Sequence, residues 1–112
     1  MGERIPRKTV EVSNQFKASR TDVYDYTFDT FGYLQAIRYR QKITDALLIL
    51  PERYLSYPEC RHIPTKSRMC RNIILDAHLI IYRITPQRIE VLDIIHGTMS
   101  VSKIRNVRKI SL

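Results

Sequence analysis

Three short apolar runs separated by turn residues occupy positions 71–97 of the chain. Each run is rich in Ile, Val, Leu and Tyr, and each has the length of a strand in a buried sheet. Asp76-Ala77 and Thr85-Pro86-Gln87 stand between the runs and are typical of tight connections. The pattern therefore predicts three consecutive strands that pair as an antiparallel meander.

The first fifty residues predict a strand followed by two helices. Residues 9–13 alternate between apolar and polar, as a strand does. Ser19 with Asp22 three residues later resembles a capping box, so the first helix is expected to begin there and to end at Gly32. The second helix is expected to end at Pro51 and to pack on the sheet as half of a helical hairpin. Its apolar stripe consists of Ala36, Tyr39, Ile43, Ala46, Leu47 and Leu50.

Two further segments carry weaker patterns. Residues 51–68 contain three prolines and predict a long surface loop, in which Tyr54 and Tyr57 either pack against the helices, the favoured interpretation, or stack on bases. After the meander, apolar residues recur every third position from Val101 to Ile110, which suits a short amphipathic helix or a last strand. The predicted class is α+β, with the order β-α-α-β-β-β.

Length and composition bound the kind of protein. A chain of 112 residues can bury one core and leaves no room for a second, so one domain is expected over residues 1–112. It has neither a signal-peptide pattern nor a run of about 20 apolar residues, which predicts a soluble, cytoplasmic protein. Cys60 and Cys70 lack metal-ligand spacing and are expected to be reduced thiols. No metal or cofactor is expected, and His62 and His78 are assigned no role.

The net charge of +8 is concentrated in the second half of the chain. Residues 61–112 hold ten Lys and Arg against three Asp and Glu, whereas residues 1–60 hold nine against eight. A basic surface of this kind attracts either a phosphate backbone or an acidic protein partner. Charge alone does not choose between the two.

Several short segments occur in a recognisable order. They are QAIRY at 35–39, LP at 50–51 with YP at 57–58, RHIP at 61–64, IIYRI at 80–84 and IEVLDIIHG at 89–97. Together with the predicted element order, this set resembles the RelE/ParE superfamily of toxins from type II toxin-antitoxin modules, over nearly the whole chain. The resemblance implies a small toxin that a cognate acidic antitoxin holds inactive in a hetero-oligomer.

Members of this superfamily divide broadly into two functions. RelE-like members are ribosome-dependent messenger RNA endonucleases, and ParE-like members inhibit DNA gyrase. Cleavage of RNA needs a base, an acid and cations that stabilise the phosphorane. In RelE-like members Lys and Arg on the sheet largely do this work, with a Tyr or His near the C-terminus. The corresponding candidates here are His96, Arg83, Arg71 and Lys66.

Other residues favour the ParE-like function. Leu79 stands where a RelE-like Arg is expected, and residues 97–100 after His96 carry no basic cluster. His96 can be a hydrogen-bonded strand-end residue, and Arg83 can pair with an acid on the next strand. The candidates for binding the target are His96, Lys103, Arg105, Arg108 and Lys109. The sequence thus predicts a toxin that binds gyrase, with two alternatives: a nuclease acting on ribosome and messenger RNA, and a degenerate, non-toxic family member.

Overall fold

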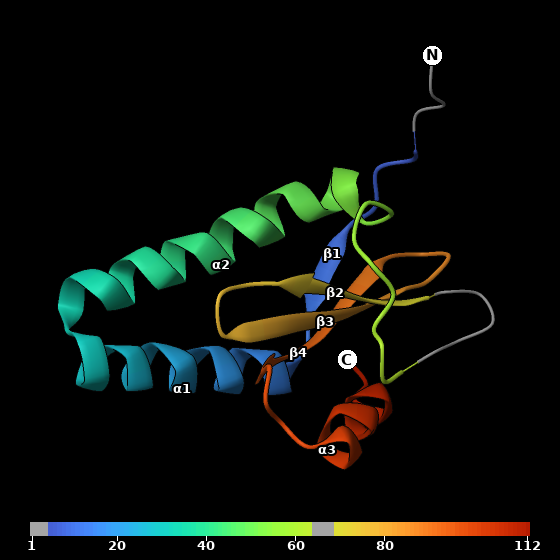
Figure 1. Cartoon of the computed structure of the whole chain (residues 1–112). Coiled ribbons are helices and arrows are strands. Elements are labelled where there is room, and N and C mark those ends of the chain that lie inside the picture. The colour runs from blue at the N-terminus through green and yellow to red at the C-terminus, as the bar shows by residue number, and fades with distance from the viewer. Residues whose placement is uncertain (1–4, 64–68) are drawn as a thin grey trace.

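The computed structural model describes residues 5–63 and 69–112 (Figure 1). It confirms the predicted β-α-α-β-β-β order of an α+β fold and adds a short helical tail. The elements are β1 (Val10–Val12), α1 (Asn14–Phe31), α2 (Tyr33–Arg53), β2 (Cys70–Ile74), β3 (His78–Ile84), β4 (Ile89–His96), α3 (Val101–Asn106) and the 3-10 turn η1 (Val107–Lys109).

The strands form one mixed sheet in the order β1-β4-β3-β2. The antiparallel pairs β2-β3 and β3-β4 confirm the predicted meander. β1 lies parallel to β4, because the chain passes through both helices before it returns to the sheet. The register between β3 and β4 shifts at Ile81/Tyr82, which is a β-bulge.

Helix α1 begins at Asn14, so the start predicted at Ser19 was wrong. Ser13 is the N-cap, and its Oγ accepts a hydrogen bond from the backbone N–H of Phe16 at 2.9 Å. The same buried hydroxyl donates to the carbonyl of Leu92 in β4. Ser19 lies inside the helix, where its Oγ accepts from the side chain of Gln15. A contact with a distant strand therefore selects the cap.

Helix α2 continues through Pro51 to Arg53, so the end predicted at Pro51 was also wrong. A proline in the last turn removes a single backbone donor, and the helix retains its other hydrogen bonds. The Pro51 carbonyl accepts from the Lys8 N–H at 3.2 Å, which ties the helix to the N-terminal segment. The predicted break at Gly32 is confirmed, with a φ of 90° that favours glycine.

The two helices cover one face of the sheet and bury what we call the hairpin core (Figure 1). Leu47, assigned from the sequence to the apolar stripe, is only partly buried against it. The hairpin core consists of Phe16, Val23, Tyr39, Ile43, Leu50, Tyr54, Ile73, Ile80, Tyr82, Ile89, Val91 and Ile94.

The opposite face is covered by residues 60–63 together with α3 and η1, which bury what we call the tail core (Figure 1). The pattern after Val101 therefore forms a short amphipathic helix, with Ile104 and Val107 buried. No helix of the described residues is both long and apolar enough to cross a bilayer. The tail core consists of Cys60, Ile63, Cys70, Ile81, Leu92, Ile95, Ile104 and Val107.

Residues 54–63 form a surface segment that is anchored by the buried side chains of Tyr54, Cys60 and Ile63, and positions 64–68 of the predicted loop lie outside the described residues. Tyr54 belongs to the hairpin core, and its phenol donates to the Pro6 carbonyl at 2.6 Å. The buried phenol of Tyr82 donates to the Tyr54 carbonyl, also at 2.6 Å. Tyr57 meets the Tyr82 ring edge-on. Both tyrosines therefore pack, as the favoured interpretation held, but against the sheet and the N-terminal segment.

Candidate functional site

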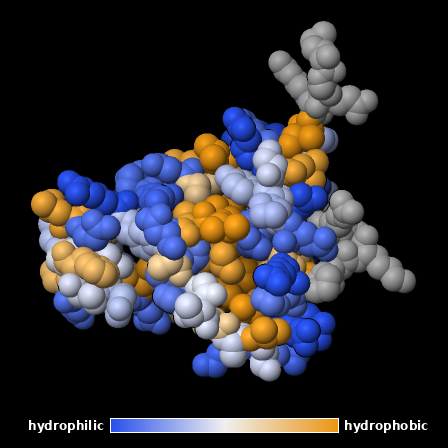
Figure 2. Space-filling model, in the orientation of Figure 1, coloured by the Kyte–Doolittle hydropathy of each residue, from blue (hydrophilic) through white to orange (hydrophobic). Residues whose placement is uncertain are grey.

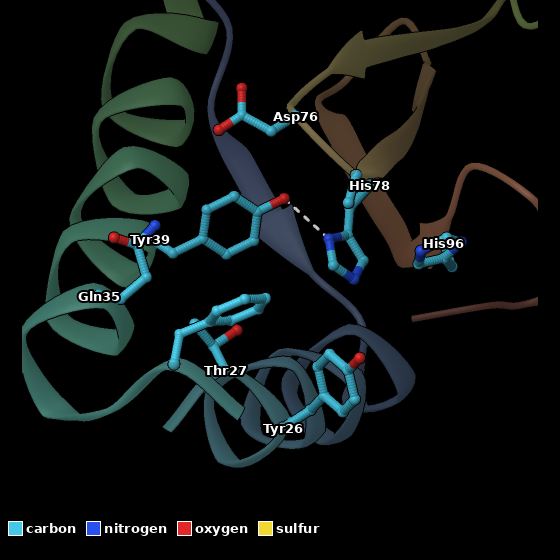
Figure 3. Close-up of a pocket in the computed structure, with 9 residues that line it drawn as sticks. Tyr26, Thr27, Gln35, Tyr39, Asp76, His78 and His96 are labelled. Atoms are coloured by element: carbon cyan, nitrogen blue, oxygen red, sulfur yellow. Dashed lines mark hydrogen bonds between the residues drawn. The ribbon is translucent and has the colours of Figure 1, made fainter. Parts of the chain in front are cut away.

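A cavity of about 370 Å³ lies between the hairpin, near its turn, and the ends of β3 and β4 (Figure 3). Aromatic side chains from both helices form much of its wall, and polar groups come from the β2-β3 turn and the strand ends. Figure 3 shows Tyr39 and His78 pointing toward one another across it. The lining residues are Tyr26, Thr27, Phe31, Gln35, Tyr39, Asp76, Ala77, His78 and His96.

His78 is held by a hydrogen bond of 2.7 Å between its Nδ1 and the phenol of Tyr39. Burial raises the pKa of the Tyr39 phenol, although the backbone N–H of Ala77 lowers it, so the phenol keeps its hydrogen. Burial, together with the neighbouring His96, lowers the pKa of His78 below its ordinary value. The neutral ring is therefore the favoured form in the folded protein.

His96 is the register partner of His78 on β4, and the two rings meet edge to face with centroids 5.4 Å apart. Its Nδ1 accepts the backbone N–H of Thr98 at 3.1 Å, so the neutral ring carries its hydrogen on Nε2. The expected hydrogen-bonded strand-end histidine is thus present. In this tautomer the His96 ring keeps an Nε2–H for a further acceptor.

The charges at the cavity are paired with each other. Lys42 Nζ lies 2.9 and 3.0 Å from the two carboxylate oxygens of Asp76. None of the described residues that line the cavity is Lys or Arg. The site can therefore offer hydrogen bonds and aromatic contacts, but the lining supplies no cation for a phosphorane.

Arg83 fastens the tail to the sheet. Its Nη2 and Nε lie 2.6 and 3.0 Å from Glu90 Oε1, so Glu90 is its acidic partner. The guanidinium also donates to the carbonyls of Arg108 and Ile110. Burial raises the pKa of Glu90, but hydrogen bonds from Arg83 and Arg88 outweigh it, and the net shift is downward. Arg83 therefore has a structural role.

The other nuclease candidates are not gathered around His96. Arg71 Nη1 donates to the carbonyls of Tyr57 at 2.8 Å and Leu55 at 3.2 Å, which holds residues 54–63 against β2. His96 ends β4, whereas the Arg83–Glu90 pair lies near the beginning of that strand. Lys66 lies outside the described residues.

Four exposed cations lie on α3 and η1, around the buried anchors Ile104 and Val107. Residues 101–112 contain no acid, so this surface has one sign of charge. We call it the basic tail surface. Its members are Lys103, Arg105, Arg108 and Lys109, all of which the sequence assigned to target binding.

A second exposed surface lies at the turn of the hairpin, beside the cavity. Tyr26, Phe31 and Leu34 are 63%, 66% and 68% exposed there. Figure 2 shows hydrophobic residues exposed at this end of the molecule, on its left. We call these three residues the hairpin-tip surface. Large apolar side chains gathered at one place on a surface are typical of a protein-binding site.

Comparison with known proteins decides the family. The family model described as "ParE toxin of type II toxin-antitoxin system, parDE" matches residues 10–101. The chain belongs to the ParE toxin family. Among solved structures it is similar to a chain of "Chromosomal ParDE TA system from P. aeruginosa", with a TM-score of 0.66 and 16% identity, over 82% of this chain and 98% of that chain. This likeness shows a shared fold. No curated protein matched the sequence.

The ParE family model covers the hairpin-tip surface but not the basic tail surface. It includes the whole hairpin and the sheet, and it ends at Val101, the first residue of α3. The basic tail surface therefore lies beyond the matched residues. The sequence also missed the Tyr39–His78 pair, because a core tyrosine and a turn histidine show no shared signal until the strand register brings them together.

Proposed function

We propose that this ParE-family toxin acts by binding DNA gyrase in the cytoplasm and that a cognate acidic antitoxin neutralises it. In this proposal residues 1–112 work as one domain. One observation carries the proposal: the described acid-base and cationic candidates are engaged by structural partners and lie apart, whereas exposed unopposed cations gather on the basic tail surface.

The contacts of the candidate catalytic residues agree better with a toxin that binds its target than with one that cleaves RNA. A nuclease needs a base, an acid and cations around one phosphate. Arg83 is held by Glu90, and Arg71 by backbone carbonyls of residues 54–63. His96 lines the cavity, whose described lining residues include no Lys or Arg. Such a site can dock a partner more readily than it can cleave RNA.

The basic tail surface is suited to a large acidic target. Its four cations protrude from a short helix whose apolar side holds it to the sheet. Charges of one sign on a rim steer association and contribute several small terms to affinity. We assign the contact with gyrase to this surface.

The antitoxin is assigned to the hairpin-tip surface and the cavity beside it. An acidic, partly disordered segment can fold onto this end, with apolar side chains against Phe31 and Leu34. The Nε2–H of His96 can donate to its carboxylates or carbonyls. Affinity at this site should then depend mainly on apolar contact, because the described residues of the cavity lining supply no Lys or Arg.

The decisive experiment compares two variants after induction in cells, with DNA supercoiling and messenger RNA ends measured together. His96→Ala should retain much of the toxicity, because a binding surface spreads its energy over several contacts. The double charge reversal Arg105→Glu, Arg108→Glu should abolish toxicity. The double variant Lys17→Glu, Arg38→Glu is the matched control, since it makes the same charge change at exposed helical positions.

The alternative function gives the opposite result. A catalytic group contributes roughly 10² to 10⁴ in rate, so its removal would silence a nuclease. Loss of toxicity in His96→Ala alone, with ribosome-dependent cleavage by the parent chain, would replace the gyrase proposal with the nuclease. Equal loss in the two double variants would show that total charge, not the basic tail surface, matters.

The antitoxin site has its own matched pair of variants. Leu34 and Leu48 are both on α2 and are 68% and 69% exposed, but only Leu34 is at the hairpin tip. Leu34→Asp should weaken binding of the neighbouring gene's acidic product by about tenfold or more, as an interface hot spot does. Leu48→Asp should leave the Kd unchanged. Equal effects in a binding titration would exclude the hairpin tip as the docking surface.

A further inference from the structure

Two buried cysteines lie opposite each other where residues 54–63 meet the edge strand β2. Glu59 and Arg71 form an antiparallel bridge between these segments. Two backbone hydrogen bonds of 3.1 Å flank it, from Asn72 N–H to the Pro58 carbonyl and from Cys60 N–H to the Cys70 carbonyl. In an antiparallel ladder, Cys60 and Cys70 are therefore the next directly opposed pair.

Residues opposed in this register stand at a separation that a disulfide can span. Hydrogen-bonded opposed residues have Cα atoms about 5.5 Å apart, within the range of about 4.4 to 6.8 Å found for disulfides. Directly opposed side chains also share one face. Both thiols do so here, since both belong to the tail core and are only 2% and 3% exposed.

The pKa shift of Cys70 also indicates that the two thiols lie close together. Burial raises the pKa of the Cys70 thiol, nearby Arg83 lowers it, and Cys60 raises it further. Burial also raises the pKa of Cys60. Both groups are therefore protonated thiols at rest, and both are free in this structure. A thiol of this kind reacts slowly, so it needs an oxidant that can reach it.

Cys60 is within reach of a small molecule. It lines an open cavity of about 350 Å³ together with Arg61, His62, Asn72 and Met99. A hydroperoxide is small enough to enter such a space. Cys70 also belongs to the tail core but is not among the residues that line this cavity, and it is the register partner of Arg83 on β3.

We propose that Cys60 and Cys70 are a thiol oxidation site, at which a hydroperoxide forms an intramolecular disulfide. Cys60 loses its thiol proton, and its thiolate attacks a peroxide oxygen; the O–O bond breaks, a sulfenic acid forms, and the departing hydroxide takes up a proton to become water. Cys70 then loses its proton, and its thiolate attacks the sulfenic sulfur; the S–O bond breaks, an S–S bond forms, and the departing hydroxide becomes a second water. Two thiols are oxidised and one peroxide is reduced. The bond fastens residues 54–63 to β2 beneath the basic tail surface.

The first test treats the reduced full chain with hydrogen peroxide, then unfolds it and alkylates every remaining thiol. Intact mass should show a monomer that has lost two hydrogens and takes up no alkyl group. Its Tm should rise by roughly 5 to 15 °C, as expected for closing a short loop. Cys60→Ala and Cys70→Ala should show no rise. If both thiols of the treated parent chain remain alkylatable, or only dimers form, the proposal is wrong.

A second measurement separates native geometry from simple proximity in sequence, and it needs no variant. The parent chain is equilibrated with glutathione at a series of redox ratios, once folded and once in guanidinium chloride. If the fold positions the thiols, the folded chain should form the disulfide at a more reducing ratio than the unfolded chain. An equal or more oxidising ratio for the folded chain would overturn the proposal.

Discussion

The two faces of the sheet are covered by structures of very different size. The hairpin contributes helices of 18 and 21 residues to one face. The other face is covered by a loop segment and by α3, which has only six residues. A helix that short is unstable on its own, so tertiary contacts must hold it in place. Buried Ile104 and Val107 supply such contacts, and Arg83 binds the carbonyls of Arg108 and Ile110 just after α3. Arg71 holds the loop segment instead, by binding the carbonyls of Leu55 and Tyr57.

Because of this difference, the most stable core and the surface to which we assign target binding lie on opposite faces of the sheet. The hairpin core joins long helices to the two central strands, so it should open only with the whole protein. The tail core holds a thin layer that should open locally at lower cost. That layer carries the exposed cations and Cys60, and it covers Cys70 on β2. The more adaptable side of the sheet is thus the side to which we assign target binding and oxidation.

The largest expected effect is the loss of the hairpin core in Ile43→Asp. Ile43 is fully buried, and the change removes a packed side chain and buries an unpaired carboxylate. We expect a loss of about 4 kcal/mol or more in unfolding free energy, and circular dichroism should show a largely unfolded chain.

Leu47→Asp is the matched comparison, because Leu47 is only partly buried. Its carboxylate can reach water, so denaturant titration should show a clearly smaller loss than for Ile43→Asp. Equal losses in the two variants would contradict the packing of α2 described above.

A smaller and more local effect is expected from Ile104→Ala in the tail core. Removing most of this buried side chain should lower the stability of the tail by about 2 to 4 kcal/mol. In amide hydrogen exchange, protection should fall across residues 101–109 while α1 and α2 keep theirs. Equal loss of protection in the hairpin would show that both faces open together, and it would remove the distinction between them.

The smallest expected effect is the pH dependence contributed by His78. Its pKa is lowered on folding, so its contribution to stability is present above its unfolded pKa of about 6.5. That contribution is lost as the pH falls from there to the lower folded pKa, because the unfolded chain binds the proton more readily. The denaturant midpoint should therefore decrease as the pH is lowered from about 7.5 to about 5.5.

His78→Gln provides the control for this pH effect, since it removes the titrating group and retains polar atoms near Tyr39. The variant should have a flatter pH profile than the parent over the same range. An unchanged slope would assign the pH dependence to other groups. In that case His78 would make no measurable contribution to the pH dependence of stability.

The sequence predicted most of the fold because its signals there were long or repeated. The meander followed from three apolar runs with turn residues between them, and the second helix followed from six apolar positions at helical spacing. The errors fell at single residues. Ser19-Asp22 has the form of a capping box, but Ser13 caps the helix, since its hydroxyl also reaches Leu92. Pro51 is tolerated because it stands in the last turn.

The candidate site was less predictable than the fold. Residue type and charge were enough to identify the basic tail residues as exposed cations. They were not enough to show that Arg83 is bound to Glu90, although Glu90 was one of the two partners considered. The Tyr39–His78 contact joins residues that are 39 positions apart, and no local pattern links them.

By itself, the sequence determined the type and order of the predicted elements, the resemblance to ParE-like toxins and the uneven distribution of charge. These properties depend on local periodicity and composition, which a single chain displays directly. The tertiary structure alone decided which serine caps α1, which cations remain unpaired, and which cysteines and histidines meet. Those outcomes depend on strand register and on contacts between residues distant in the chain, where a shift of one position changes every partner.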